Sequence, residues 1–186
     1  MIGRPASQTI DGPAGLLEVV IEEPAHAPVG LAVIAHPHPL QGGTMDNKVV
    51  HTLCRAFVLA GWRAVRFNFR GVGLSEGGWD EGRGETADLL TVVAHHLTDP
   101  ALKGLPLALA GFSFGGYVAA QAHARLTEAA ADADAKIDIA GQQIKVGVNP
   151  QVLKNAEALI PLGRGGTPEE AAGAVYMFCI PESNYV

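Results

Sequence analysis

Residues 111–115 read G-F-S-F-G and fit the pattern G-x-S-x-G. An apolar run at 105–110 precedes this serine turn, and a helix-like segment follows it. A serine on a sharp turn between a strand and a helix can act as a nucleophile, and the flanking glycines let the backbones approach closely. The N–H of the next residue, Phe114, and the positive end of the helix then stabilise a developing oxyanion. The pattern predicts Ser113 as an acyl nucleophile; an ordinary glycine-rich connection is the alternative.

A second segment whose residues could take part in catalysis is H-P-H-P at residues 36–39, which follows the apolar run 30–35. A loop in this position supplies the second N–H of an oxyanion hole. Since Pro37 and Pro39 have no N–H, the backbone of His38 is the best donor. The alternatives are a rigid loop with two solvated histidines and a metal site on the same two histidines.

A serine nucleophile of this kind needs an acid and then a histidine later in the chain. The only histidine after Ser113 is His123, which lies ten residues along the following helix. At 1.5 Å per residue that is about 15 Å away, too far for contact. His38 and His36 are the alternative bases, provided that one lies within about 3 Å of the serine hydroxyl. We therefore expect impaired turnover.

The elements that must position these residues alternate between strand-like and helix-like from about residue 8 to 128. Apolar or alternating runs predict strands at 16–21, 30–35, 63–69 and 105–110. Periodic apolar spacing predicts helices at 45–60, 86–97 and 113–128. Such alternation predicts an α/β fold, a mainly parallel sheet with helices on both faces.

The serine turn, the H-P-H-P loop and a glycine-rich loop between them together resemble the α/β-hydrolase superfamily over about residues 8–128. The likeness is strongest to small bacterial hydrolases with the segment HPHP-x-x-GG-T-M-x-N-K, matched here by residues 36–48. The resemblance implies an α/β-hydrolase-like core and esterase-type activity on a small-molecule acyl or ester substrate. It also implies Ser113 as the nucleophile and the N–H groups of Phe114 and His38 as the oxyanion hole.

Residues from about 136 to 186 resemble the C-terminal part of a short-chain dehydrogenase/reductase. The stretches I-P-L-G-R-G-G-T-P-E-E at 160–170 and P-E-S-N-Y-V at 181–186 carry this resemblance. No tyrosine has a lysine four residues on, so the catalytic pair of that family is missing and we expect no cofactor. A chimera of a hydrolase-like portion, 8–128, and a reductase-like segment, 129–186, is therefore expected. The alternatives are a non-catalytic chimeric or truncated protein and an NAD(P)-binding reductase relic.

For the part after residue 128, we expect a strand at 144–148 beside the strand 105–110. Helices are expected at 151–160 and 167–179. The segment 129–186 is predicted to pack on the same sheet as the hydrolase-like portion.

The composition limits the function classes. With 186 residues, 48% of them hydrophobic, the chain can bury one substantial core. A net charge of −6 argues against a nucleic-acid partner. No apolar run reaches the roughly 18–20 residues of a membrane span. Two cysteines and the lack of a secretory leader predict a cytoplasmic protein. We expect no bound metal. The sequence does not determine the oligomeric state.

Overall fold

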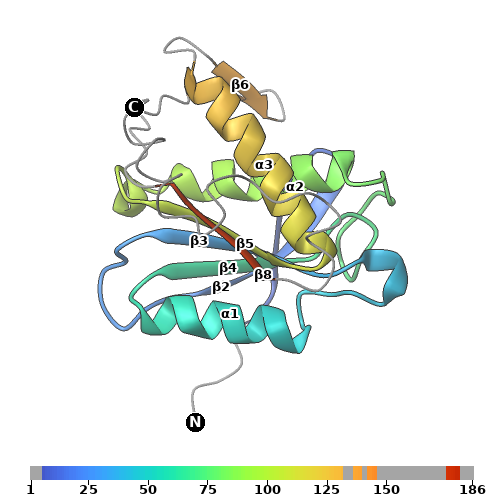
Figure 1. Cartoon of the computed structure of the whole chain (residues 1–186), viewed down its shortest axis with the longest axis horizontal. Coiled ribbons are helices and arrows are strands. Elements are labelled where there is room, and N and C mark those ends of the chain that lie inside the picture. Colours follow the sequence, from blue (N-terminus) through green and yellow to red (C-terminus); the bar gives the residue numbers. More distant parts are fainter. Residues whose placement is uncertain (1–5, 132–135, 140–141, 146–174, 181–186) are drawn as a thin grey trace.

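The computed structural model describes residues 6–131, 136–139, 142–145 and 175–180. Its helices are α1 (Lys48–Leu59), α2 (Arg83–Leu97) and α3 (Phe114–Ala131), with short 3₁₀ turns η1 (Pro39–Gln41) and η2 (Pro100–Leu102). Its strands are β1 (Gln8–Gly12), β2 (Gly15–Glu22), β3 (Leu31–Ala35), β4 (Arg63–Phe67), β5 (Leu107–Phe112), β6 (Lys136–Ile139), β7 (Gln142–Lys145) and β8 (Val175–Ile180). β6 and β7 pair with each other, and the other strands described form one sheet (Figure 1).

The main sheet has the strand order β1-β2-β4-β3-β5-β8 and is mixed. β3 runs parallel to β4 and β5, with Val33 opposite both Val65 and Leu109. β1, β2 and β8 pair antiparallel with their neighbours. The prediction of a mainly parallel sheet is therefore corrected, because only the three central strands run parallel. The tight turn between β1 and β2 leaves room only for an antiparallel hairpin, whereas parallel strands need a long crossover.

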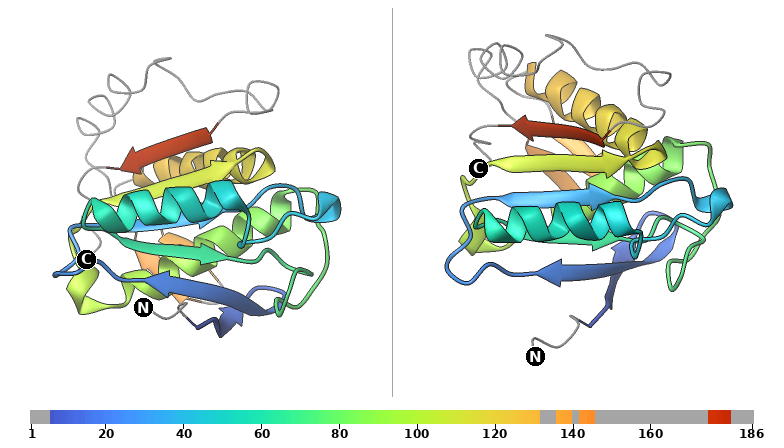
Figure 2. Two further views of the ribbon diagram at one scale, coloured as in Figure 1. Left: turned by 90° about the horizontal axis from the view of Figure 1, so that it is seen from below. Right: turned by 60° about the horizontal axis from the view of Figure 1, so that its bottom comes forward.

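Helices cover both faces of this sheet, as predicted (Figure 2). On one face, Val50, Cys54 and Phe57 of α1 pack against alanines of β3, β4 and β5. On the other face, α2 and α3 enclose the larger core, which includes Val33 and Leu109. Because side chains alternate along a strand, β3 and β5 are apolar on both faces.

Side-chain caps determine where two helices begin. The side chain of Asn47 accepts a hydrogen bond from the N–H two residues on and so starts α1. The buried Glu85 carboxylate accepts from the N–H groups of Asp80 and Gly82, at 2.9 and 2.7 Å. This cap starts α2 at Arg83, earlier than the predicted start at residue 86.

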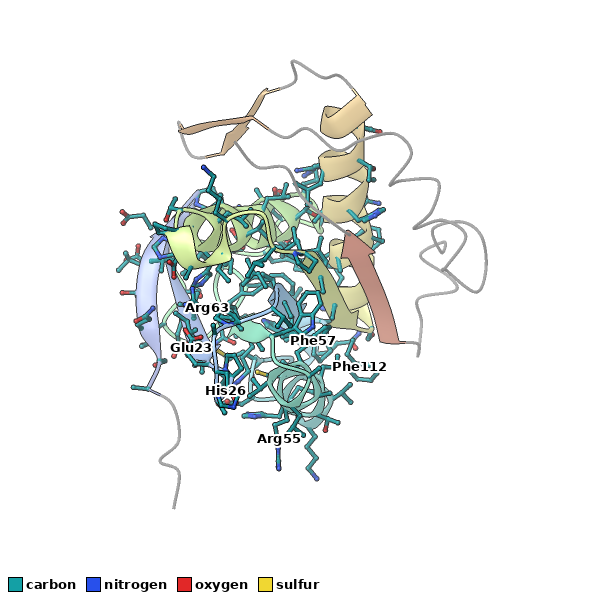
Figure 3. The ribbon with its side chains drawn as sticks, turned by 90° about the vertical axis from the view of Figure 1, so that its left-hand side faces the viewer. Glu23, His26, Arg55, Phe57, Arg63 and Phe112 are labelled. Atoms are coloured by element: carbon teal, nitrogen blue, oxygen red, sulfur yellow. The ribbon has the colours of Figure 1, made fainter. Side chains whose placement is uncertain are left out.

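Two arginines join β4 to its surroundings. Arg63 pairs with Glu23 Oε1 at 2.8 Å (Figure 3) and with Asp99 Oδ2 at 2.6 Å. Arg66 is almost fully buried and donates to Glu22 Oε1 and to an oxygen of the Asp46 carboxylate. These pairs connect β4 to the end of β2, to η2 and to the loop before α1.

β8 covers the outer edge of β5, with Ala110 opposite Met177. The sequence-based prediction of a helix over 167–179 is wrong at its C-terminal end, because residues 175–180 are extended. These residues read V-Y-M-F-C-I, a run of β-branched, aromatic and other apolar residues. Such residues favour a strand, and the otherwise open edge of β5 provides the partner.

Of the expected strand 144–148, the described residues 144 and 145 do not lie beside β5. Residues 142–145 form β7 instead and pair with β6, with Ile144 opposite Ile137. A hairpin between neighbouring segments costs less loop-closure entropy than a pairing with the distant β5. The expected helix 151–160 and residues 160–170 of the reductase-like pattern lie outside the described residues. None of the described helices is long and apolar enough to cross a membrane.

Candidate active site

Ser113 lies on a sharp turn between β5 and α3, with a backbone φ of 55°. This left-handed conformation is strained for a residue with a Cβ. The Ser113 carbonyl accepts from the N–H groups of Gly116 and Tyr117, at 2.9 and 3.2 Å, so the helix begins directly after it. Among the described residues, none makes a hydrogen bond with the Ser113 hydroxyl. The turn thus has the geometry that presents a serine side chain for reaction.

Glycines bring the serine turn close to its surroundings. A Cβ on Gly111 would lie 2.5 Å from the nitrogen of Gly116 and closer still to the backbone of Gly115. A Cβ on Gly115 would lie 2.6 Å from the carbonyl oxygen of His36 and closer still to that of Ala35. Both positions therefore require glycine. Because Gly115 touches the end of β3, the H-P-H-P loop lies against the serine turn.

Two backbone N–H groups border this turn. Phe114 is the first residue of α3, and His38 directly precedes η1. Within the described residues, neither N–H donates a hydrogen bond. The first turn of a helix carries free N–H groups and a positive partial charge. Ser113 precedes Phe114 in the chain, and the rings of Phe114 and His38 lie 5.0 Å apart, so the two N–H groups without a described partner belong to neighbouring residues.

Aromatic rings line the surface beside Ser113. The ring centroids of His38, Trp79 and Phe114 lie 4.5–5.0 Å apart. Phe114 also contacts Phe69 and Tyr117, at 5.7 and 6.0 Å. The three rings of the first group are half-buried, so part of each faces solvent. This surface, the aromatic wall, consists of rings tilted by 30–47° against one another and can bind an aromatic or apolar group.

His36 is fully buried and both of its ring nitrogens are engaged. Nε2 accepts from the N–H of Phe69 at 3.1 Å, and Nδ1 lies 2.6 Å from the carbonyl oxygen of Pro37. An N–H can only donate, so Nε2 is unprotonated and Nδ1 carries the proton. Burial lowers the pKa of His36 from 6.5 to about 4, against the opposing effect of the bond to Pro37. This arrangement leaves no free nitrogen for a base or for a metal ligand.

The ring of His38 is placed differently. Its Nδ1 is buried and has no partner among the described residues, while its ring contacts Trp79 and Phe114. His123 lies within α3, on the helix that leads away from Ser113. In the part of the chain that the structure describes, no histidine is hydrogen-bonded to Ser113. Among the described residues, the Ser113 hydroxyl therefore has no histidine partner.

A buried ion pair braces the loop that follows β4, and sequence reasoning missed its acidic member. Asp88 of α2 is fully buried and accepts from the guanidinium of Arg70 through both carboxylate oxygens. It also accepts from the Arg70 backbone N–H at 3.0 Å. A Cβ at Gly84 would overlap the Arg70 side chain, so this glycine makes room for it. The only sequence signal is an acidic residue among the apolar positions of a helix.

Two solved structures with similar folds are described as α/β serine hydrolases. An alpha-beta serine hydrolase homologue from Coxiella burnetii is 44% identical, with a TM-score of 0.60, over 65% of this chain and 58% of that chain. An α/β serine hydrolase without a lid from Xanthomonas campestris is 40% identical, with a TM-score of 0.62, over 68% and 59%. An uncharacterized protein of Rickettsia prowazekii is 37% identical over 115 residues, which is 60% of this chain and 46% of that protein.

These comparisons identify the fold as that of the α/β-hydrolases. The chain belongs to the family described as serine aminopeptidase, S33, whose model matches residues 33–154, more than half of the chain. The chain spans about half the length of its curated relative. The family match extends past residue 136, where the reductase-like pattern begins, and that second resemblance stays a prediction.

Proposed function

We propose that this protein is a serine hydrolase that acts on small esters or related acyl compounds, with Ser113 as the nucleophile. The observation that carries the proposal is the strained turn at Ser113, closed by glycines at positions 111 and 115. Strain of this kind persists where the surrounding structure enforces it, and it is concentrated at functional sites. The membership in a hydrolase family supports the same conclusion.

In this proposal the Ser113 oxygen attacks the carbonyl carbon of the substrate and forms a C–O bond. The carbonyl π electrons move to oxygen, and the N–H groups of Phe114 and His38 stabilise the resulting anion. Collapse of this intermediate breaks the bond to the leaving group, which takes up the proton that the Ser113 hydroxyl has lost, and leaves an acyl-enzyme; water then hydrolyses this ester and returns a proton to Ser113. The aromatic wall favours substrates whose acyl or alcohol part is apolar or flat.

The proton of the Ser113 hydroxyl needs an acceptor, and in this proposal the lack of an aligned acceptor slows catalysis. No aspartate–histidine pair follows Ser113 in the order that completes a triad. His38 is the remaining candidate base, because its Nδ1 has no partner among the described residues. That nitrogen is buried and makes no hydrogen bond with the Ser113 hydroxyl, so we expect slow turnover from this chain. An oxyanion hole without a base still accelerates reactions over water.

A fluorophosphonate probe tests the nucleophile, because it reacts with activated serines. Without an aligned base the labelling should be slow, but we expect it at Ser113 after long incubation, located by peptide mass spectrometry, and none in Ser113→Ala. A folded wild type that stays unlabelled, or is labelled elsewhere, would overturn the assignment.

Hydrolysis of p-nitrophenyl acetate tests the expected slow turnover, and rapid turnover that Ser113→Ala abolishes would refute it. A titration with NADH, followed by its fluorescence, tests the reductase-relic alternative, for which we expect no binding.

A further inference from the structure

We propose that His36 is a positioning residue, whose buried imidazole holds the Pro37–His38 peptide so that the His38 N–H faces the serine turn. The inference rests on the proposed function, because it assigns a purpose to the second oxyanion donor. It gives the two histidines of the H-P-H-P loop different tasks. His36 orients the peptide and makes no contact with substrate, while the backbone of His38 binds the oxyanion.

The first step is the direction of one peptide group. In a trans peptide the C=O and N–H point in opposite directions, and no described peptide bond is cis. The C=O of Pro37 points at the Nδ1 of His36, at 2.6 Å. The N–H of His38 therefore points away from the His36 ring and from the core in which that ring is buried.

The second step concerns the backbone dihedral angles of the loop that can still change. The ring of Pro37 restricts its φ, and Pro39 restricts the conformation of His38, which has φ −54° and ψ 121°. The main movement left is a flip of the peptide between Pro37 and His38. Such a flip would exchange the N–H for a carbonyl oxygen and repel an oxyanion. The hydrogen bond from His36 opposes this flip.

The third step is the anchoring of His36 itself. Its Nε2 accepts from the N–H of Phe69, and its ring lies 4.5 Å from the Phe69 ring. The next residue, Arg70, is held by the buried Asp88 through its backbone and its side chain. The bond from Phe69 forces the proton of His36 onto Nδ1, where it is needed to hold Pro37.

Two substitutions separate the two hydrogen bonds of His36. The amide of His36→Asn ends near the position of Nδ1 and can still donate to Pro37. The amide of His36→Gln ends near the position of Nε2 and can accept from Phe69 without reaching Pro37. His96→Asn is the matched control, because His96 is also a buried histidine but lies at the end of α2.

The first measurement is the rate of fluorophosphonate labelling at Ser113. Loss of one oxyanion donor lowers rates by about 10²–10³-fold in other hydrolases. We expect His36→Gln to lower the rate by at least about tenfold, whereas His36→Asn restores it to within a few-fold of wild type. His96→Asn should leave the rate unchanged. Equal losses in His36→Asn and His36→Gln would overturn the proposal, because they would indicate a merely structural role.

The second measurement does not require activity. In ¹⁵N-labelled protein, His36 should show the neutral tautomer protonated at Nδ1, and the His38 amide signal should shift in His36→Gln but not in His36→Asn. A tautomer protonated at Nε2 in the wild type would overturn the proposal even if neither variant folds. If the wild type is not labelled by the probe, the proposed function fails, while the tautomer and amide signals still decide the positioning role.

Discussion

His36 makes the stability of this fold depend on pH. Burial lowers its pKa from 6.5 to about 4, and the hydrogen bond to Pro37 only partly opposes this effect. The folded protein therefore keeps His36 neutral under conditions in which the unfolded chain protonates it. The stability that comes from the neutral form is complete above about pH 6.5 and is lost as the pH falls towards about 4.

The size of the effect follows from the difference between the two states. At about 1.4 kcal/mol per pH unit, lowering the pH from 6.5 to 5 costs about 2 kcal/mol of unfolding free energy for one such histidine. His96 behaves in the same way, because burial, and then the neighbouring His95, lower its pKa to about 4. Together the two histidines should remove about 4 kcal/mol by pH 5.

Urea unfolding followed by tryptophan fluorescence, at about pH 7.5 and about pH 5, measures this loss. His36→Asn and His96→Asn each remove one buried imidazole, so each should reduce the loss by about 2 kcal/mol, and the double variant by about 4 kcal/mol. Carboxylate effects are common to all four proteins and cancel in the comparison. If wild type and His36→Asn lose the same free energy between the two pH values, the fold does not hold His36 neutral.

Two further predictions concern the brace and the serine turn. Asp88→Ala leaves Arg70 without its buried partner and should lower the free energy of unfolding by about 3–5 kcal/mol; in urea unfolding, a loss under about 1 kcal/mol would contradict this role. Ser113→Gly removes the Cβ from a residue with φ 55° and should raise the free energy of unfolding by about 1 kcal/mol. Ser113→Ala keeps the strain and is its control, and equal stability of these two variants would refute the strain at the turn.

Much of the fold and of the candidate site was predictable from short stretches of sequence. β3 and β5 are brief apolar runs, which are typical of strands buried on both faces, and β4 lies in a segment whose residues alternate with the period of a strand. The serine turn was predictable because the pattern G-x-S-x-G lies within five residues, and the close approach of Gly111 to Gly115 and Gly116 is local. Pro37 and Pro39 likewise single out the backbone of His38 within four residues of sequence.

Other features depend on segments that are distant in sequence. The identity of β8 as a strand depends on the open edge of β5, because its apolar pattern fits a helix as well. The early start of α2 depends on how Glu85 folds back onto the N–H of Asp80. The burial of the Asp88 carboxylate in α2 depends on Arg70, which lies in the loop that follows β4.

The two histidines of the H-P-H-P loop show this division most clearly. By itself the sequence determined the serine turn and the histidine backbone between two prolines, because each pattern is local. It does not distinguish the side chains of His36 and His38, which have the same type and similar neighbours. The tertiary structure decided that difference, because the N–H that fixes the proton of His36 belongs to Phe69, at the end of another strand.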